Sequence, residues 1–307
     1  MDIVKDSLGR IFLDANGNVL ISNAASFYYP SYIDLLYKAG DFDKSTGSAY
    51  WWRNSAEKSR KYINSFDYTT NRVNCTAHGF SNNETLLFAL DDSGTLPSGL
   101  SKGQIYFIVN KATDYFQVAI TNGGAAVSLI NNGSGLNSFF PNVQYNSTLV
   151  NQPQIISHDS VGQKGINIAK VSGIGTYMTL NIGKSIKTLF IVGKRVVSNA
   201  SNLVWNSSVA SIVSDTLTSS VVLNNSWKNN LSKSTTANSI IANENYIYCF
   251  EYATSQLLLQ LSRYGDGASS FTNYIFEIIG INRNLTLQER NYIFNMLSNK
   301  FAKPLDA

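Results

Sequence analysis

Few residues in this sequence combine the types and spacing that a catalytic site requires. Cleavage of a glycan with retention needs two carboxylates about 5 Å apart, which a β-strand supplies through acidic residues that alternate along it. Glu251 and Glu277 lie in β-type runs, but no second acidic residue alternates with either of them. His158 stands between Ser157 and Asp159, yet a catalytic triad assembles in space and not from chain neighbours. The sequence therefore predicts no catalytic residues and no enzymatic activity.

Metal-binding and cofactor motifs are equally weak. Residues 14–18 begin like a calcium-binding loop, but the Glu needed at the twelfth loop position is missing. Their Asn16-Gly17 pair, between two apolar runs, favours a type I′ hairpin turn instead. No cysteine and histidine spacing suits zinc, and no glycine-rich phosphate loop opens a helix. Cys75 and Cys249 lie in alternating apolar runs, so we expect buried, reduced thiols and neither a metal ion nor a cofactor.

Aromatic and acidic residues in polar loops are the remaining candidates for a binding site. Trp227 lies in the polar stretch 224–230, where an exposed indole could stack on a sugar or anchor a protein partner. The alternative is a Trp227 side chain that folds back onto its own domain. Tyr264 and Asp266 share a second loop of similar character. We assign Trp227, Tyr264 and Asp266 as candidate glycan- or partner-binding residues.

The chain that carries these residues has little charge. Charged residues make up 14% of its 307 residues, against roughly 25% in an average soluble domain. The net charge of +4 is scattered, whereas a nucleic-acid-binding protein concentrates basic residues on one face, so we expect no nucleic-acid partner. No apolar run approaches about 18 residues, so we expect no membrane insertion. The N-terminus lacks an apolar signal-peptide segment, which predicts synthesis and folding in a cytoplasm.

The pattern of apolar residues and turn signals predicts an all-β fold. Residues 10–22 predict a hairpin, because two apolar runs flank its Asn-Gly turn. Residues 66–137 read as a small module of short strands, with a Gly- and Asn-rich exit linker at 131–137. Longer β-type runs follow between 161 and 281, which favours a large sandwich.

Only the C-terminal end has helical spacing. Thr286 and Glu289 form a capping box, in which the hydroxyl caps the Glu289 amide while the carboxylate reaches back. Apolar residues then recur at helical intervals as far as Phe301, and Pro304 follows. We predict one helix over about 286–302, packed against the sandwich.

Residues 274–303 resemble the closing strand and helix of concanavalin A-like (laminin-G-like) jelly rolls. In that pattern an acidic residue in a β-run precedes a short loop and a capped helix, and the matching residues are Glu277, Leu285, Thr286, Glu289 and Leu297. The segments 33–41 and 52–55 are similar to the opening strand and the tryptophan-containing turn of such domains. Without this resemblance, 31–38 could equally form a helix. The resemblance implies a jelly-roll sandwich with a C-terminal helix and a core position for Trp52.

A second resemblance lies in the predicted module. The stretches 76–80 (Thr-Ala-His-Gly-Phe), 96–100 (Leu-Pro-Ser-Gly-Leu) and 104–109 (Gln-Ile-Tyr-Phe-Ile-Val) resemble a small β module of bacteriophage tail and fibre proteins. In such modules an Ala-His-Gly turn is followed by a Leu-Pro turn, a strand and a Gly-Gly hairpin. This resemblance implies a phage virion protein.

Together the two resemblances imply a discontinuous domain and a role in the virion. The jelly roll would comprise 28–65 and 138–307, and the inserted module 66–137. Because an isolated hairpin is not stable and open strand edges invite pairing, we expect the N-terminal hairpin, 1–27, to act as an assembly arm, the alternative being a hairpin packed on its own domain. The implied function is that of a fibre, spike or decoration subunit, which forms a homo-oligomer and binds other virion proteins. The alternative function is a lectin-like adhesin that binds host-surface glycans. A glycan depolymerase is a weaker alternative, because the carboxylate pair is missing.

Overall fold

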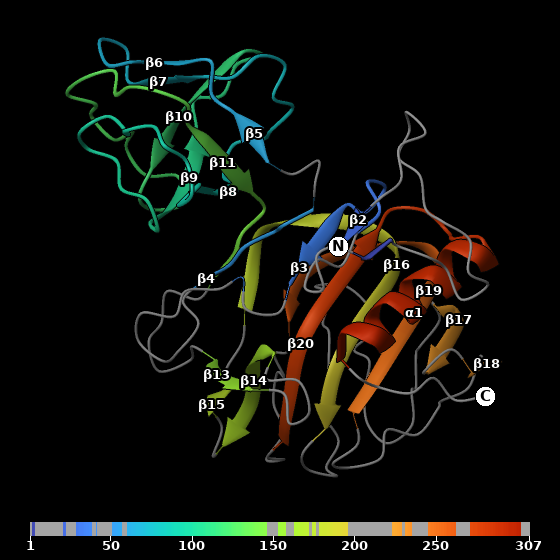
Figure 1. Cartoon of the computed structure of the whole chain (residues 1–307). Coiled ribbons are helices and arrows are strands. Elements are labelled where there is room, and N and C mark those ends of the chain that lie inside the picture. The colour runs from blue at the N-terminus through green and yellow to red at the C-terminus, as the bar shows by residue number, and fades with distance from the viewer. Residues whose placement is uncertain are drawn as a thin grey trace. The chain divides into compact units, whose positions relative to one another are not determined.

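The structure is a computed structural model of the whole chain, shown in Figure 1. It describes residues 2–3, 21–22, 29–38, 41, 51–56, 60–145, 153–157, 163–171, 174–175, 178–195, 223–228, 231–234, 245–261 and 271–301. Over these residues the chain forms antiparallel β-sheets and one α-helix, which confirms the predicted all-β class. The jelly-roll topology within that class stays a prediction. This described part holds no helix that is both long and apolar enough to cross a bilayer.

Met1–Pro30 form a compact unit of their own. In this unit β1 (Asp2–Ile3) pairs antiparallel with β2 (Ile21–Ser22). The predicted turn at Asn16-Gly17 lies outside the described residues. The role of residues 1–27 as an assembly arm therefore stays a prediction.

A small antiparallel sheet contains only residues from 61 to 141. Its strands are β5 (Lys61–Tyr62), β6 (Ser65–Asp67), β7 (Arg72–Asn74), β8 (Thr85–Phe88), β9 (Ile105–Val109), β10 (Tyr115–Ala119) and β11 (Ser138–Pro141). Their order across the sheet is β5-β11-β8-β9-β10-β7-β6 (Figure 1). The segment 61–67, here called the closing strand, forms both β5 and β6, which stand at the two ends of that order. Its start pairs with β11 and its end pairs with β7, so this segment closes the sheet into a barrel. Closure removes the open edges through which sheets aggregate.

Aromatic side chains fill this barrel. Phe88, Phe116 and Phe139 are fully buried, and the rings of Phe116 and Phe139 meet edge to face with centroids 5.4 Å apart. Edge-to-face packing of this kind stabilises a core beyond the burial of its area. The barrel extends past the predicted module 66–137, because β5 precedes that range and β11 follows it. β11 pairs with both β5 and β8, so these two outer strands complete the barrel.

The second, larger sheet has eleven strands among the residues that the structure describes. They are β3 (Leu35–Tyr37), β4 (Trp51–Trp52), β12 (Gln144–Tyr145), β13 (Gln154–Ser157), β14 (Lys164–Val171), β15 (Ile174–Gly175), β16 (Met178–Arg195), β17 (Leu223–Lys228), β18 (Leu231–Ser234), β19 (Asn245–Leu261) and β20 (Phe271–Ile281). Seven of them form the main path, in the order β13-β14-β20-β16-β19-β17-β18 (Figure 1). The long strands β16, β19 and β20 lie next to one another, and their pairing forms the body of the sheet.

The segment before the barrel forms a strand and not the alternative helix. β3 pairs antiparallel with β20, which places Leu36 opposite Ile279. Trp52 is fully buried, as expected, and its indole N–H donates to the Lys38 carbonyl (2.8 Å). Asn54 is also fully buried, and its Oδ1 accepts the Leu36 N–H (2.9 Å). These bonds hold the turn after β4 against β3.

The helix α1 (Leu287–Phe301) confirms the prediction at the C-terminal end. The Glu289 N–H donates to Thr286 Oγ1 (3.2 Å), and the Thr286 N–H donates to Glu289 Oε2 (2.9 Å), so the predicted capping box is present. The buried apolar side chains of the helix are Ile293, Phe294, Met296, Leu297 and Phe301. Lys300, in the last turn, forms a buried ion pair with Glu277 of β20. The pair joins the helix to the large sheet.

Candidate functional site

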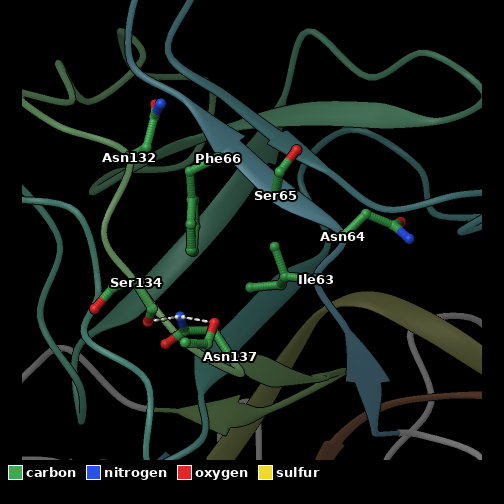
Figure 2. Close-up of a pocket in the computed structure, with 8 residues that line it drawn as sticks. Ile63, Asn64, Ser65, Phe66, Asn132, Ser134 and Asn137 are labelled. Carbon is green, nitrogen blue, oxygen red and sulfur yellow. Dashed lines mark hydrogen bonds between the residues drawn. The ribbon is translucent and has the colours of Figure 1, made fainter.

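A pocket of about 250 Å³ opens beside the strand that closes the barrel (Figure 2). One wall is this closing strand, which contributes Ile63, Asn64, Ser65 and Phe66. The other wall is the segment that leads into β11, which contributes Asn132, Ser134, Gly135 and Asn137. None of these lining residues carries a charge. The pocket is therefore small, and amide and hydroxyl groups dominate its polar lining.

The closing strand changes its hydrogen-bonding partner at the pocket. The Ile63 N–H donates to the Asn137 carbonyl (3.0 Å) just before β11, whereas the Asn64 N–H donates to a carbonyl of β7 (2.9 Å). Burial follows this change: Ile63 and Phe66 are buried, but Asn64 and Ser65 between them are both exposed. Two successive outward residues interrupt the alternation of a regular strand. The interruption gives the pocket two apolar side chains, Ile63 and Phe66, and a polar rim.

The opposite wall, residues 131–137, is fixed by long-range bonds. Ser134 and Thr95 exchange two backbone hydrogen bonds of 2.8 and 2.9 Å. Gly133 has a φ of 61°, and a Cβ added there would lie 2.4 Å from the Thr95 carbonyl oxygen, so glycine is required. The prediction that 131–137 is an exit linker is wrong, because its pairing with residues 94–98 makes it part of the barrel wall.

Asn137 connects the two walls and is 3% exposed. Its backbone carbonyl accepts the Ile63 N–H bond, and its Nδ2 donates to the carbonyl oxygens of Ser134 (3.1 Å) and Gly135 (3.3 Å), as Figure 2 shows. Its Oδ1 is buried and has no hydrogen-bond partner among the residues that the structure describes. Buried polar atoms nearly always have a partner. Asn137 Oδ1 is thus a buried acceptor that the described residues leave without a partner.

Two further amides on the rim are oriented through their oxygens. Asn64 Oδ1 accepts the Thr76 N–H (2.9 Å), and Asn132 Oδ1 accepts the Tyr68 N–H (2.9 Å). An amide oxygen held in this way fixes the plane of its group and the direction of its NH₂. Within the described part of the chain, the NH₂ groups of Asn64 and Asn132 make no hydrogen bond, but Figure 2 shows that the Asn64 side chain points away from Ile63 and out of the pocket.

Exposed tyrosines stand at either end of the closing strand. Tyr62 directly precedes Ile63 and is 57% exposed, and Tyr68 is 47% exposed. The Tyr68 N–H is bonded to Asn132 on the opposite wall, although Tyr68 itself does not line the pocket. Tyrosine combined with Ser, Asn and Gly is the composition of adaptable recognition surfaces.

The binding residues predicted from the sequence do not belong to this pocket. Trp227 lies in β17 and is 6% exposed, and the guanidinium of Arg290 from α1 lies 3.9 Å from the centre of its ring. The prediction of an exposed stacking platform is therefore wrong for Trp227, whose side chain packs against the helix, as in the alternative interpretation. Tyr264 and Asp266 lie outside the described residues.

The acidic residues considered for catalysis are buried in the large sheet. Glu277 is fully buried and paired with Lys300, and Glu251 is 7% exposed within β19. These positions suit structural roles in the sheet. Among the residues with described positions, no three His, Cys, Asp or Glu side chains lie close enough to hold a metal ion.

The described histidine and the two cysteines also occupy structural positions. His78 is 5% exposed, and its ring stacks on Phe80 with centroids 5.2 Å apart, inside the barrel. His158 lies outside the described residues. Cys75 and Cys249 are buried and not joined by a disulfide, as predicted, and burial raises the pKa of both thiols. Neither cysteine has the exposure and low thiol pKa of a reactive group.

Sequence reasoning missed every residue of the pocket. The residues at 131–137 signal turns through their Gly and Asn content, but their partners at 94–98 are remote in the sequence. The pocket also depends on the closure of the barrel at 63–66, where one strand pairs first with β11 and then with β7. A break in alternation, Ile-Asn-Ser-Phe at 63–66, was the only local signal of that bend.

Comparison with known proteins adds no relative. No family model matches the chain, and no curated protein or solved structure matches it at a significant level. The likenesses to jelly rolls and to phage modules therefore rest on the sequence motifs alone.

Proposed function

We propose that this protein is a structural protein of a bacteriophage virion, a fibre, spike or decoration subunit that acts by assembly and surface display. Its partners are other virion proteins and further copies of the same chain, and its location is the virion after synthesis in the host cytoplasm. The motifs at 76–109 and 274–303 support the proposal through their resemblance to phage and jelly-roll domains. The structural observation that supports the proposal is the attachment of the barrel to the large sheet. A virion protein that displays one domain on another needs such an attachment.

The apolar part of this attachment is one buried cluster that spans both sheets. It contains Trp51, Leu87, Ile105, Phe107 and Val143. Trp51 comes from β4 of the large sheet, whereas Ile105 and Phe107 come from β9 of the barrel. The indole N–H of Trp51 also donates to the Gly103 carbonyl of the barrel (3.1 Å). A buried aromatic anchor with a satisfied polar group is a strong contact between two surfaces.

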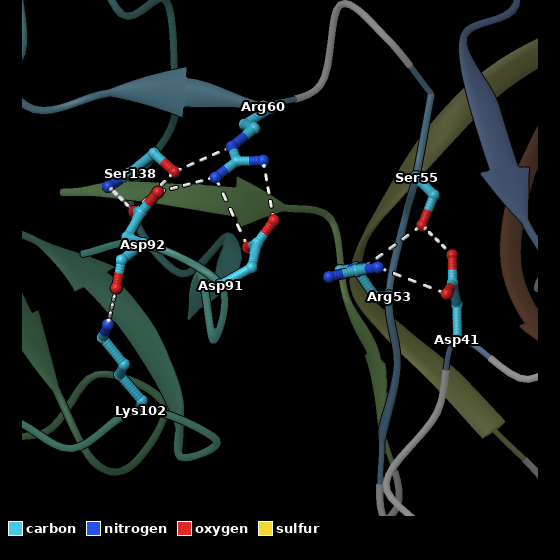
Figure 3. Close-up of polar contacts among 8 residues, drawn as sticks. All are labelled: Asp41, Arg53, Ser55, Arg60, Asp91, Asp92, Lys102 and Ser138. Atoms are coloured by element: carbon cyan, nitrogen blue, oxygen red, sulfur yellow. Dashed lines mark hydrogen bonds and ion pairs between the residues drawn. The ribbon is translucent and has the colours of Figure 1, made fainter. Parts of the chain in front are cut away.

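The polar part of the attachment surrounds Phe140 of β11. The guanidinium groups of Arg53 and Arg60 lie 4.5 and 5.4 Å from the centre of the Phe140 ring. Figure 3 shows how both arginines are held: Arg53 pairs with Asp41 (3.2 Å), and Arg60 pairs with Asp92 (2.6 Å). An arginine can bind a carboxylate through its edge and an aromatic ring through its face. These contacts hold the barrel beside the chain segment that follows β4.

Mass spectrometry of purified phage particles tests the proposed function. Particles of the phage whose genome carries this sequence, washed at high salt, should retain the chain in a fixed ratio to the capsid and tail proteins. A chain that is abundant in the infected cell but absent from the washed particles would contradict the proposal. An antibody against the barrel should in addition label intact particles under the electron microscope.

A lectin-like adhesin is the second candidate function, and the pocket favours it. An uncharged lining of amides and hydroxyls suits the hydroxyl groups of a glycan, and adhesion is compatible with display on a virion. A glycan array combined with a reducing-sugar assay on the same preparation separates the candidates. Binding without sugar release supports the adhesin, whereas sugar release would support the weaker alternative of a depolymerase.

A further inference from the structure

We propose that the fold shields the barrel from tension along the chain, so that a force applied to the two ends must open the large sheet before it loads the barrel. The proposal concerns how the protein carries a load. It therefore goes beyond assembly and display, and it does not depend on whether the protein belongs to a virion. It rests on three junctions, at each of which segments remote in the sequence are bonded side by side, and each junction is enclosed by the one before it along the chain.

The outer junction joins the segment before β3 to the end of β20. The Asp34 N–H donates to the Gly280 carbonyl (3.0 Å), and the Asn282 N–H donates to Asp34 Oδ2 (2.8 Å). The antiparallel pairing of β3 with β20 begins at the same place, with Leu35 opposite Gly280. Tension that enters at Asp34 and leaves at Asn282 therefore crosses these bonds directly and does not pass through the chain between them.

The middle junction holds the chain where it leaves the large sheet for the barrel and where it returns. Trp52 of β4 lies opposite Gln144 of β12, and both are fully buried. Trp51 lies opposite Tyr145, which also pairs with Thr179 of β16. The departing and returning segments are thus strands of one sheet, so tension between them is carried by their pairing and not by the barrel.

The inner junction lies at the entrance of the barrel. Tyr62 of β5 lies opposite Ser138 of β11, and Lys61 lies opposite Phe139. The Arg60 Nε–H donates to Ser138 Oγ (2.9 Å), which ties the same two segments together. Opposite residues of an antiparallel pair have Cα atoms about 4.5–5.5 Å apart, so the barrel begins and ends at almost the same point. The barrel is therefore joined to the large sheet at one place and does not lie in series between two parts of it.

The nesting of these junctions sets the order in which tension opens the fold. The start of β3 and the end of β20 lie at the same end of their pairing, so tension separates one pair at a time, starting from Leu35 and Gly280. A ladder loaded one pair at a time resists less force than one whose pairs are loaded together. The middle junction is loaded only after the outer junction opens, and the inner junction only after the middle one. The barrel is therefore loaded last.

Optical tweezers with the full chain test this order. With handles at the two ends of the chain, we expect the large sheet to open before the barrel. The barrel then unfolds in a later step, or at the same instant if the force already exceeds what the barrel withstands, but never earlier. A separate barrel step has a recognisable length, because residues 62–138 release about 270 Å at about 3.5 Å per residue.

A second pair of handles places the barrel alone under tension. Cysteines introduced by Ser81→Cys and Ser128→Cys are accessible to thiol-reactive handles, since both serines are exposed, whereas Cys75 and Cys249 are buried. The large sheet does not lie between these handles. We expect the barrel to unfold here without any opening of the large sheet, with a release of at most about 160 Å at about 3.5 Å per residue.

The variant His78→Ala separates shielding from simple stability, because a very stable barrel would also unfold last. The His78 ring packs on Phe80 inside the barrel, so its loss weakens the barrel directly. With handles at the two introduced cysteines, the force that unfolds the barrel should fall in H78A. With handles at the chain ends, the force that opens the large sheet should stay unchanged in H78A, because the barrel does not yet carry the load.

A step of about 270 Å that precedes the opening of the large sheet in the unaltered chain would overturn the proposal. With handles at the chain ends, a fall in H78A of the force that opens the large sheet would overturn it as well, since the barrel would then carry the load from the start. Neither result would remove the chain from washed particles, so both leave the virion proposal standing.

Discussion

At the scale of single residues, the histidine of the Ala-His-Gly turn has a structural role. His78 Nδ1 accepts the Phe80 N–H (3.0 Å), so the proton of the neutral ring is on Nε2, which donates to the Tyr115 carbonyl (3.2 Å). The ring also meets Phe116 edge to face, with centroids 5.2 Å apart. His78 thus closes its own turn through the bond from Phe80 and links that turn to β10 by one hydrogen bond, to Tyr115, and by ring packing on Phe116.

We predict that His78→Ala lowers the free energy of unfolding by about 3 kcal/mol, because it leaves the buried Phe80 N–H unpaired and removes a packed ring, whereas the Tyr115 carbonyl keeps its bond from the Ala112 N–H. Urea unfolding followed by tryptophan fluorescence and by circular dichroism measures the change. A loss below about 1 kcal/mol would show that the turn does not depend on the imidazole.

The buried ion pair between Glu277 and Lys300 leads to a second prediction. Breaking a buried pair typically costs about 3–5 kcal/mol, since the remaining charge stays buried, so Glu277→Gln should be strongly destabilising. The double variant Glu277→Gln with Lys300→Met removes both charges and should recover most of that loss. Equal free energies of unfolding for the single and the double variant would contradict this role of the ion pair. Polysaccharide cleavage by the unaltered protein that disappears in E277Q would show that Glu277 is catalytic instead.

At the scale of elements, the first turn of α1 depends on one carboxylate. The hydrogen bonds of Arg283 to Glu289 are the main cause that lowers the pKa of this carboxyl from 4.5 to about 2, and bonds from Thr286 add to the effect. Because the pKa is lower in the folded than in the unfolded chain, the stabilisation is complete above about pH 4.5 and is lost as the pH falls towards 2.

We predict that NMR titration of the Glu289 side chain gives a midpoint near pH 2, and that Glu289→Gln removes this carboxylate's share of the acid destabilisation. A Glu289 midpoint at its ordinary value would mean that the Arg283 pair does not form in solution.

The elements also show which parts of the fold follow from local sequence. The helix could be predicted to within one residue at each end, because capping chemistry and helical spacing are local signals. Within the β-type runs predicted between 161 and 281, β16 is a single strand of 18 residues, and its pairing to β19 contains register shifts. Those irregularities interrupt the alternation of apolar residues while the hydrogen-bonded ladder goes on. The candidate site could not be predicted, since it forms where remote segments of the barrel meet.

At the scale of the whole molecule, residues 1–27 are the predicted assembly arm. Their compact unit, Met1–Pro30, has its own strand pairing, and short two-stranded sheets are not stable alone in water. We predict that deletion of residues 1–26 leaves a folded chain whose oligomer has a lower mass by light scattering. An unchanged mass together with a lower melting temperature would instead make the segment part of its own subunit's fold.

The proposed function requires that the barrel, with its pocket, lies on the surface of a phage particle. An electron cryomicroscopy map of intact particles, at a resolution that separates strands, tests it most directly. We expect density that fits the large sheet and the barrel of residues 61–141, with residues 63–66 and 132–137 facing solvent. Particles without such density, or with the pocket buried against another virion protein, would contradict it.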